Sequence, residues 1–322
     1  MRERMRIVFC GTPQFAVPSL RLFLTQSDFE LLAIITQPDR PRGRGHELSF
    51  SPVKQVALEA KIPVHQPEKI RAPEIQGMLQ ALAPDVIVII AYGQIIPARL
   101  LPIPGLGWIN LHASLLPKYR GAAPINWAIV NGETQTGVTT MRIDAGMDTG
   151  DTLLQRETAI GPTETAPELA SRLAELGAPL MVETLRGLGA GSLVPRPQDH
   201  SLATHAPMLK REDGLIAWNL RSEQIFNRIR GFAPWPGAYT TFRGQTCHVT
   251  GQPAASSAGP KDPPGTLILA MKPEPQLLVV CGGETVLRLL SVKVEGRKEI
   301  SASEFANGAR LKPGERFGQV DR

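Results

Sequence analysis

A carboxamide and an imidazole stand two residues apart in the segment NLHASLLPKYRGAAP, as Asn110 and His112. Residues i and i+2 of an extended strand face the same side, so both groups would emerge together. An amide N–H donates well to an oxyanion, and an imidazole moves protons near neutral pH. A carboxylate from the acidic loop 144–151 would hold or tune that imidazole. Together these groups suit acyl transfer through a tetrahedral intermediate.

A purely structural explanation of the same residues stays open on spacing alone. In it, Asn110 caps a turn and His112 is a hydrogen-bonded core residue. Two of the acids in the loop also have ordinary uses. Asp144 is typical of a turn residue, and Asp151 begins a strand from which it would support the loop.

These side chains need a strand that ends at residue 112, and the surrounding pattern predicts one. Apolar runs alternate with helical stretches along the first half of the chain, which predicts an α/β fold with an open, doubly wound parallel sheet. In such sheets ligands bind at the carboxyl ends of the strands, where Asn110 and His112 would lie. The expected strands are 6–10, 30–37, 85–92, 107–112, 137–144 and 151–158, and the expected helices are 52–60, 72–82 and 165–188.

The pattern changes after residue 188. Residues 189–207 lose periodicity and are rich in Gly, Pro and Ser, which indicates a linker. Residues 208–322 contain short, alternating, turn-bounded strands, which predict a small antiparallel β-barrel. The expected domains are therefore 1–188 and 208–322, joined by this linker.

Charge is distributed unevenly between these parts. The net charge is +5, with 16 Lys and Arg against 11 Asp and Glu in residues 208–322, and 19 of each in residues 1–207. The surplus permits a polyanionic partner for the C-terminal domain without identifying one.

Composition and motifs exclude several classes. No apolar run approaches the roughly 20 residues that cross a bilayer, and the N-terminus lacks a signal-peptide pattern, so we expect a cytosolic protein with no membrane partner. Cys10, Cys247 and Cys281 lack metal-ligand spacing and are expected to be buried thiols. The first strand–helix turn, GTPQF, lacks the glycines of a dinucleotide site, which removes the main support for a dehydrogenase. No phosphate-binding P-loop and no G-x-S-x-G elbow is present.

The stretches NLHASLLPKYRGAAPINWAI and GVTTMRIDAGMDTGD resemble the signature of the folate-dependent formyltransferases. Further stretches, among them TQPDRPRGRG, HAPMLKREDGLIAWN and FAPWPGAYT, extend the resemblance over nearly the whole chain, to members that formylate a charged tRNA. The resemblance implies that Asn110, His112 and Asp148 are the catalytic trio. It also implies a folate site lined by Ser114, Leu115, Leu116 and Pro117.

The same resemblance implies a reaction and its partners. The formyl group of 10-formyltetrahydrofolate would pass to the α-amino group of methionyl-initiator tRNA, without a metal. The protein would consist of a Rossmann-like domain, a linker and an OB-like domain, and we expect it to act as a monomer.

Basic residues near the expected site are candidates for tRNA contact. Arg40, Arg42 and Arg44 fall in one loop broken by Gly and Pro, which is usually a solvated loop but here favours phosphate contact. The resemblance brings this loop to the acceptor end of the tRNA. Lys210 and Arg211, at the start of the C-terminal domain, would face the same groove.

Two other functions remain open at this point. Another 10-formyltetrahydrofolate-dependent formyltransferase, acting on a sugar nucleotide or ribotide amine, would share the trio and differ in its acceptor. An RNA-binding protein with an inactive enzyme fold would share the domains, although the intact trio weighs against it.

Overall fold

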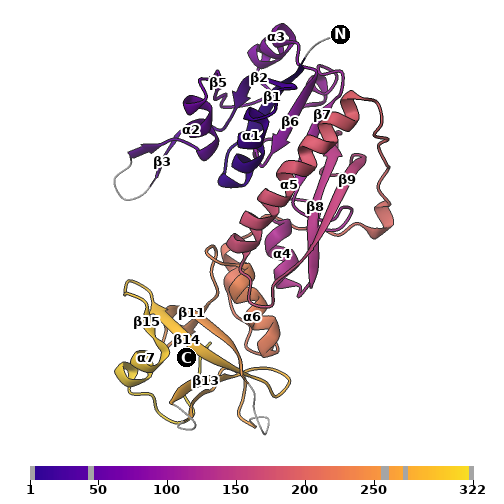
Figure 1. The fold of residues 1–322 in the computed structure, drawn as a ribbon. Helices are drawn as coiled ribbons and strands as arrows, with labels where there is room; N and C mark the ends of the chain where they lie inside the picture. Colours follow the sequence, from indigo (N-terminus) through magenta and orange to yellow (C-terminus); the bar gives the residue numbers. More distant parts are fainter. Residues whose placement is uncertain (1–3, 43–46, 255–260, 271–274, 319–322) are drawn as a thin grey trace. The chain divides into compact units, whose positions relative to one another are not determined.

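The structure is a computed structural model that describes residues 4–42, 47–254, 261–270 and 275–318 (Figure 1). The chain forms two compact units. Unit 1 comprises Met1–Pro124, Gln135–Ala159 and Glu168–Pro207, and unit 2 comprises Ile125–Thr134, Ile160–Pro167 and Met208–Arg322. The segment 189–207, expected as a linker, therefore clusters with unit 1.

Unit 1 is built on a seven-stranded sheet of order β5-β2-β1-β6-β7-β8-β9. The strands β5, β2, β1, β6 and β7 pair in parallel, whereas β8 pairs antiparallel with both β7 and β9. Neighbouring strands joined by a short loop run antiparallel, which explains the pairing of β8 with β9 across residues 143–151. The strands are β1 (Met5–Gly11), β2 (Phe29–Ile35), β5 (Val64–His65), β6 (Val86–Ile90), β7 (Trp108–His112), β8 (Gln135–Arg142) and β9 (Thr152–Ala159). The expected Rossmann-like α/β class is confirmed, with this mixed edge as the difference.

Helices cover both faces of the sheet. On one face Phe9 of β1 meets Phe23 of α1, with ring centroids 5.9 Å apart. On the other face Val8 of β1 shares a core cluster with Leu79 of α3. The helices of this unit are α1 (Val17–Leu24), α2 (Pro52–Glu59), α3 (Pro73–Leu82) and α5 (Ala166–Gly189), the last of which begins in unit 2.

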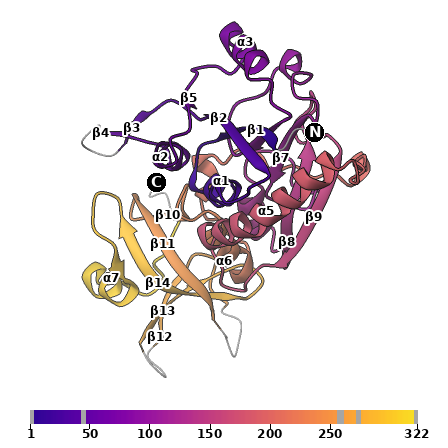
Figure 2. The ribbon, with the colours of Figure 1, turned by 45° about the horizontal axis from the view of Figure 1, so that its top comes forward.

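The long helix α5 packs against β7 and β8 (Figure 2). Gly177 of α5 lies against Leu111 of β7, so closely that a Cβ on it would sit 2.5 Å from the leucine side chain. On β7 the side chains alternate, and Trp108 belongs to the core cluster on the α3 side. Asn110 and His112 therefore share the α3 side of the sheet, opposite α5.

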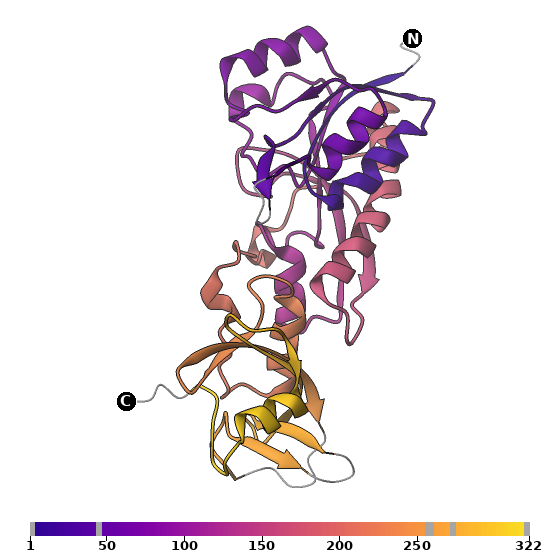
Figure 3. The same ribbon diagram turned by 90° about the vertical axis from the view of Figure 1, so that its left-hand side faces the viewer.

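Unit 2 contains a six-stranded, all-antiparallel sheet in which β10-β11-β14-β13-β12 are neighbours and β15 pairs with β14. The helix α7 packs on β13 and β14 (Figure 3). A core of aliphatic and aromatic side chains lies beneath the sheet, with Trp218 stacked on Phe317 at 5.6 Å. The elements are α6 (Ser222–Gly231), β10 (Tyr239–Phe242), β11 (Gln245–Ala254), β12 (Leu267–Ala270), β13 (Gln276–Val280), β14 (Val286–Val294), β15 (Ile300–Ser301) and α7 (Ala302–Ala309).

The helix α4 (Pro124–Val130) contributes most of its length to unit 2. Its Trp127 meets Phe232, which follows α6, edge to face at 5.6 Å. Gly231 at the end of α6 lies against Val130, where a Cβ would come within 2.7 Å of the valine. Residues inserted between two strands of the unit 1 sheet thus pack against the end of α6 in unit 2.

Two further findings concern the cysteines and membrane spans. All three cysteines are buried free thiols, as expected, and burial raises the pKa of Cys281 to about 12. Among the residues that the structure describes, no helix combines the length and the apolar character that crossing a bilayer requires.

Candidate active site

The candidate site begins at the carboxyl end of β7. His112 is buried, with 6% of its surface exposed, whereas Asn110 is half-buried. The Asn110 carboxamide makes no hydrogen bond with any other residue in the described part of the chain. A half-buried amide without a protein partner has both of its N–H groups available to a ligand oxygen.

A backbone carbonyl holds His112 from one side. The Nε2 atom of His112 lies 2.9 Å from the carbonyl oxygen of Tyr119. A carbonyl only accepts hydrogen bonds, so Nε2 must carry the proton and the lone pair of the neutral ring lies on Nδ1. Tyr119 has a left-handed backbone (φ 60), and its N–H donates to Thr204 Oγ1 at 2.8 Å.

Asp148 faces His112 on the Nδ1 side. Its Oδ2 atom lies 3.7 Å from Nδ1 and accepts a 2.8 Å hydrogen bond from the Gly121 N–H. Asp148 also has a left-handed backbone, with φ 54. The two residues that hold the imidazole, Tyr119 and Asp148, therefore both adopt a conformation that costs roughly 1–3 kcal/mol and persists only when its surroundings enforce it.

Gly121 is required where it stands. Its φ is +119, and a Cβ on it would lie 2.6 Å from the carbonyl oxygen of Ala206. Only glycine fits this position without moving the loop, and the loop delivers the N–H that fixes Asp148.

Asp144 serves the turn, as the sequence indicated. Its carboxylate accepts from the Gly146 N–H at 3.0 Å and from the Thr149 hydroxyl at 2.8 Å, and it is exposed. Asp151 immediately precedes β9, and its backbone carbonyl accepts a hydrogen bond from the Arg142 N–H at 2.9 Å.

The residues expected at the folate site form a fixed turn directly after β7. Ser114 is fully buried, and its hydroxyl donates to the Lys118 carbonyl at 2.6 Å. The Thr139 hydroxyl donates to the Ser114 carbonyl at 2.6 Å and accepts from the Leu116 N–H at 3.1 Å. Leu116 is buried, while Leu115 and Pro117 are half-buried, so the turn presents a partly exposed apolar edge beside the imidazole.

The residues expected to contact tRNA lie in different parts of the chain. Arg42 ends β3 (Arg40–Arg42), which pairs with β4 (Glu47–Ser49), and the disposition of its side chain is outside the described structure. Arg44 lies outside the described residues. Lys210 is exposed in unit 2, where its N–H donates to Asp213 Oδ2 at 2.7 Å.

Asp39 belongs to the arginine loop, the segment 38–45 that carries Arg40, Arg42 and Arg44, and it forms an ion pair with Lys54. Lys54 donates to the carboxylate of Asp39 and to the side-chain Oε1 atom of Gln66, the latter at 2.7 Å. The hydrogen bond from Lys54 lowers the pKa of Asp39, against the opposing effect of burial, and a further bond from Gln66 at 2.9 Å adds to the lowering.

A row of polar side chains crosses the sheet of unit 2. In the strand register Tyr239 is paired with His248, and His248 with Lys293. Partial burial lowers the pKa of His248, and the charges of Lys293 and Arg211 lower it further, while Glu295 opposes them. Alternation along each strand could have identified these residues as lying on one face, but only the strand register shows that they are neighbours.

Sequence reasoning missed the groups that hold the imidazole and its partner. Tyr119 acts through its carbonyl and Gly121 through its N–H, so neither side chain carried a signal. Gln198 also bonds the Asp148 carbonyl and is itself held by Arg120, and the stretch that contains Gln198 was expected to be a linker.

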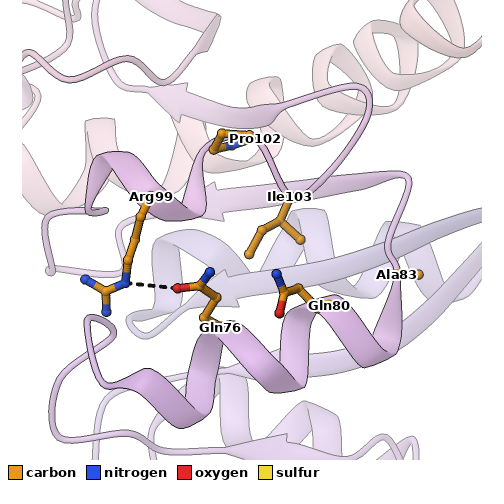
Figure 4. Close-up of a pocket in the computed structure, with 6 residues that line it drawn as sticks. All are labelled: Gln76, Gln80, Ala83, Arg99, Pro102 and Ile103. Atoms are coloured by element: carbon orange, nitrogen blue, oxygen red, sulfur yellow. Dashed lines mark hydrogen bonds between the residues drawn. The ribbon is translucent and has the colours of Figure 1, made fainter.

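No metal centre accompanies this site among the described residues, and the one pocket considered below lies apart from it. Across the part of the chain that the structure describes, no group of three His, Cys, Asp or Glu side chains could hold a metal ion. A surface pocket of about 330 Å³ lies between α3 and residues 99–103, with Arg99 bonded to Gln76 at 3.1 Å (Figure 4). None of its lining residues belongs to the site at β7, and Arg99 is exposed, so we assign the pocket no part in the chemistry.

The arrangement at β7 has the components of acyl transfer. It offers an unpartnered N–H donor, an imidazole whose basic nitrogen is directed toward a carboxylate, and a fixed apolar edge. The donor suits an oxygen that gains negative charge, and the imidazole suits a proton that must be taken up and returned.

Comparison with known proteins identifies relatives over the whole chain. The family model described as "Formyl transferase" matches residues 5–185, and "Formyl transferase, C-terminal domain" matches residues 208–310. A methionyl-tRNA formyltransferase of Solibacter usitatus is 54% identical over 98% of this chain and 99% of its own length. One of Geobacter metallireducens is 50% identical with the same coverage. Among solved structures, the sugar 3N-formyl transferase WlaRD aligns with a TM-score of 0.63 at 17% identity, over 91% of this chain and 99% of its own, which supports the fold alone.

Proposed function

The chain belongs to the formyl transferase family, and we propose that it transfers the formyl group of 10-formyltetrahydrofolate to the α-amino group of methionyl-initiator tRNA. The product would be N-formylmethionyl-tRNA for translation initiation. The observation that carries the chemistry is the Asn110 carboxamide, unpartnered in the described part of the chain, together with an imidazole that the Tyr119 carbonyl fixes and the Asp148 carboxylate faces. The acceptor is supported by relatives that are about half identical along nearly the whole chain and carry that activity in their names.

The folate supplies the formyl group, and the residues at β7 fit its transfer. The Asn110 N–H donates to the formyl oxygen and stabilises the negative charge that develops there when the amine adds. A single donor of this kind is typically worth ~3–4 kcal/mol. The turn from Ser114 to Pro117, through Leu115 and Leu116, lines the folate site and holds its position through Thr139.

His112 is the group that carries the proton during the transfer. Its Nδ1 atom takes the proton of the attacking amine, directly or through a water bonded to Asp148, and a proton returns to the departing nitrogen. The Tyr119 carbonyl keeps Nε2 protonated, so only Nδ1 is basic. The Asp148 carboxylate, 3.7 Å away, stabilises the imidazolium that results.

The C-terminal unit and the arginine loop would bind the tRNA. Arg42, Arg44 and Lys210 are the proposed phosphate contacts, and the surplus of positive charge in residues 208–322 supports this role. We also propose that the protein acts as a monomer in the cytoplasm, where translation initiation takes place.

The direct test is an assay with charged tRNA. Purified protein is incubated with 10-formyltetrahydrofolate and methionyl-initiator tRNA, and the formylated aminoacyl-tRNA is detected by mass spectrometry. Methionyl-elongator tRNA, a ribotide amine and an amino-sugar nucleotide serve as competing acceptors. Formylation of one of the small amines in preference to the tRNA would favour the rival formyltransferase, and absence of any turnover would overturn the proposal.

A matched variant connects that assay to the site. Asn110→Asp keeps the size and shape of the side chain but replaces the N–H donor with an oxygen. We expect kcat to fall by roughly 10²–10³-fold, as for other single oxyanion donors. A variant with normal kcat would show that the carboxamide plays no part in the transfer.

A further inference from the structure

The segment 196–206 returns to the site after α5. Arg196 pairs through its backbone with Thr152 at the start of β9, with both N–H···O distances 2.8 Å. Farther along, the Arg120 N–H donates to the Thr204 carbonyl at 2.9 Å, and the Ala206 N–H donates to the Arg120 carbonyl at 2.7 Å. The segment therefore lies between the two loops that hold Tyr119 and Asp148.

Gln198 is the side chain of this segment that reaches the Asp148 loop. It is buried, with 7% of its surface exposed. Its Nε2 atom donates to the carbonyls of Asp148 at 2.9 Å and Gly150 at 2.7 Å. Its Oε1 atom accepts from Arg120 twice, at 3.1 Å from Nε and 2.7 Å from a terminal nitrogen. Both ends of the carboxamide are thus fully used.

Arg120 sets the orientation of that carboxamide. Its side chain is 5% exposed, and its other partner is His200 Nδ1 at 3.2 Å. No carboxylate within the described residues pairs with it. A guanidinium only donates, so Gln198 Oε1 must face Arg120, and the two N–H groups must face the carbonyls of the Asp148 loop.

We infer that Gln198 is a positioning residue for the transfer, which holds Asp148 in its left-handed conformation with the carboxylate toward His112. Two contacts over-determine this conformation: Gly121 bonds the side chain of Asp148 and Gln198 bonds its carbonyl. Without the second contact the loop loses the restraint that maintains φ 54, and the carboxylate moves away from Nδ1. The inference rests on the proposed function for its catalytic consequence.

Two substitutions separate positioning from simple packing. Gln198→Ala removes all four hydrogen bonds. Gln198→Glu keeps an acceptor for Arg120, now as a buried ion pair, but has no N–H for the carbonyls of Asp148 and Gly150. We expect both variants to lose roughly 10²-fold in kcat, because a small displacement of a reacting group has that effect, without a matching change in KM for either substrate. Gln135→Ala, at an exposed glutamine of β8, is the matched control and should behave as wild type.

A double-mutant cycle tests whether Gln198 acts through Asp148. In the background of Asp148→Asn, the change Gln198→Ala should cause little further loss of kcat, because the group that it positions is already disabled. Restoration of kcat in Gln198→Glu, or losses that multiply in the double variant, would overturn the inference.

Hydrogen exchange provides a readout that does not need the reaction. The Gly121 amide donates to Asp148, so its exchange should accelerate in Gln198→Ala and stay slow in Gln135→Ala, as followed by NMR of glycine-labelled protein. Unchanged protection of this amide would overturn the inference even if the proposed reaction is correct. Conversely, if wild-type protein formylates no tRNA, the proposed function fails while the exchange data still decide whether Gln198 holds the loop.

Discussion

The Nδ1 atom of His112 lies 3.7 Å from the Oδ2 atom of Asp148, which is an ion-pair distance but too long for a hydrogen bond. The same Oδ2 atom is already bonded to the Gly121 N–H at 2.8 Å. The carboxylate therefore acts on the ring through its charge, and a proton or a water can enter between them. This separation distinguishes the pair from one in which the carboxylate directly fixes the tautomer, a task that the Tyr119 carbonyl performs here.

Replacing His112 with alanine should remove most of the activity while the fold persists. The imidazole is the proposed proton carrier, so we expect kcat to fall by roughly 10²–10⁴-fold. Steady-state kinetics together with circular dichroism would check both parts. A folded variant that retains a near-normal kcat would refute the assignment.

Asp148→Asn should also lower kcat strongly, since it keeps the shape of the side chain but removes the charge opposite Nδ1. Asp144→Asn is the matched control, because Asp144 belongs to the same loop and its carboxylate bonds Gly146 and Thr149, its partners among the described residues. The expected result is a large loss for the first variant and a small one for the second. Equal effects of the two substitutions would mean that the loop acts only through its shape.

Gly121→Ala should impair both stability and turnover. A Cβ at φ +119 would be strained, at roughly 1–3 kcal/mol, and would collide with the Ala206 carbonyl. The resulting shift of the loop would withdraw the N–H from Asp148 and lower kcat. Gly105→Ala, at a position with open space around it, should leave melting temperature and kcat unchanged. If both variants melt and turn over like wild type, the loop adapts more easily than its contacts indicate.

Asp39→Asn should reveal a pH-dependent contribution to stability. The folded state lowers the pKa of Asp39 through its bond to Lys54, so the stabilisation is present above the unfolded pKa of about 3.9 and is lost as pH falls through the folded value. Near pH 7 the variant should be less stable by about 1.5–3 kcal/mol, the range for a hydrogen bond to a charged group. Urea unfolding at pH 7 and near pH 3 would measure the difference in the free energy of unfolding between wild type and Asp39→Asn. This difference should become smaller at the lower pH. A difference that is independent of pH would exclude the ionised carboxylate as its source.

His248 offers a spectroscopic reporter of tRNA binding to unit 2. Partial burial and the charges of Lys293 and Arg211 lower its pKa in the free protein, while Glu295 has a weaker opposite effect. Phosphates bound at this face would offset those cations and raise the pKa, which an NMR titration with and without tRNA would detect. Lys293→Ala should raise the pKa of His248 in the free protein and serves as the calibration. A pKa that does not change at saturating tRNA would argue that the nucleic acid binds elsewhere.

The sequence predicted much of the fold because apolar periodicity and turn residues determine local structure. The strand expected at 107–112 is β7, and the helix expected at 165–188 is α5. The antiparallel direction of β8 relative to β7 was not expected, because residue type carries little information on strand direction when both faces are covered.

The site was predictable only in part, for physical reasons. Asn110 and His112 were identified by strand alternation, and Asp148 by resemblance, whereas their roles stay predictions. The carbonyl of Tyr119 and the N–H of Gly121 belong to the backbone, which every residue shares. Gln198 lies 50 residues from Asp148 in a stretch without periodicity, so only the folded chain brings them together.

The position of Gln198 and Thr204 in the chain also affects the order in which the site can form during synthesis. A ribosome releases the chain from its N-terminus, so β7 and the Asp148 loop emerge well before residues 198–204. Until that segment leaves the exit tunnel, Tyr119 lacks its bond to Thr204 and Asp148 lacks its bond to Gln198. A nascent chain can therefore assemble the sheet of unit 1 while its proposed acyl-transfer centre is still incomplete, and this centre is completed only as synthesis turns to the C-terminal unit.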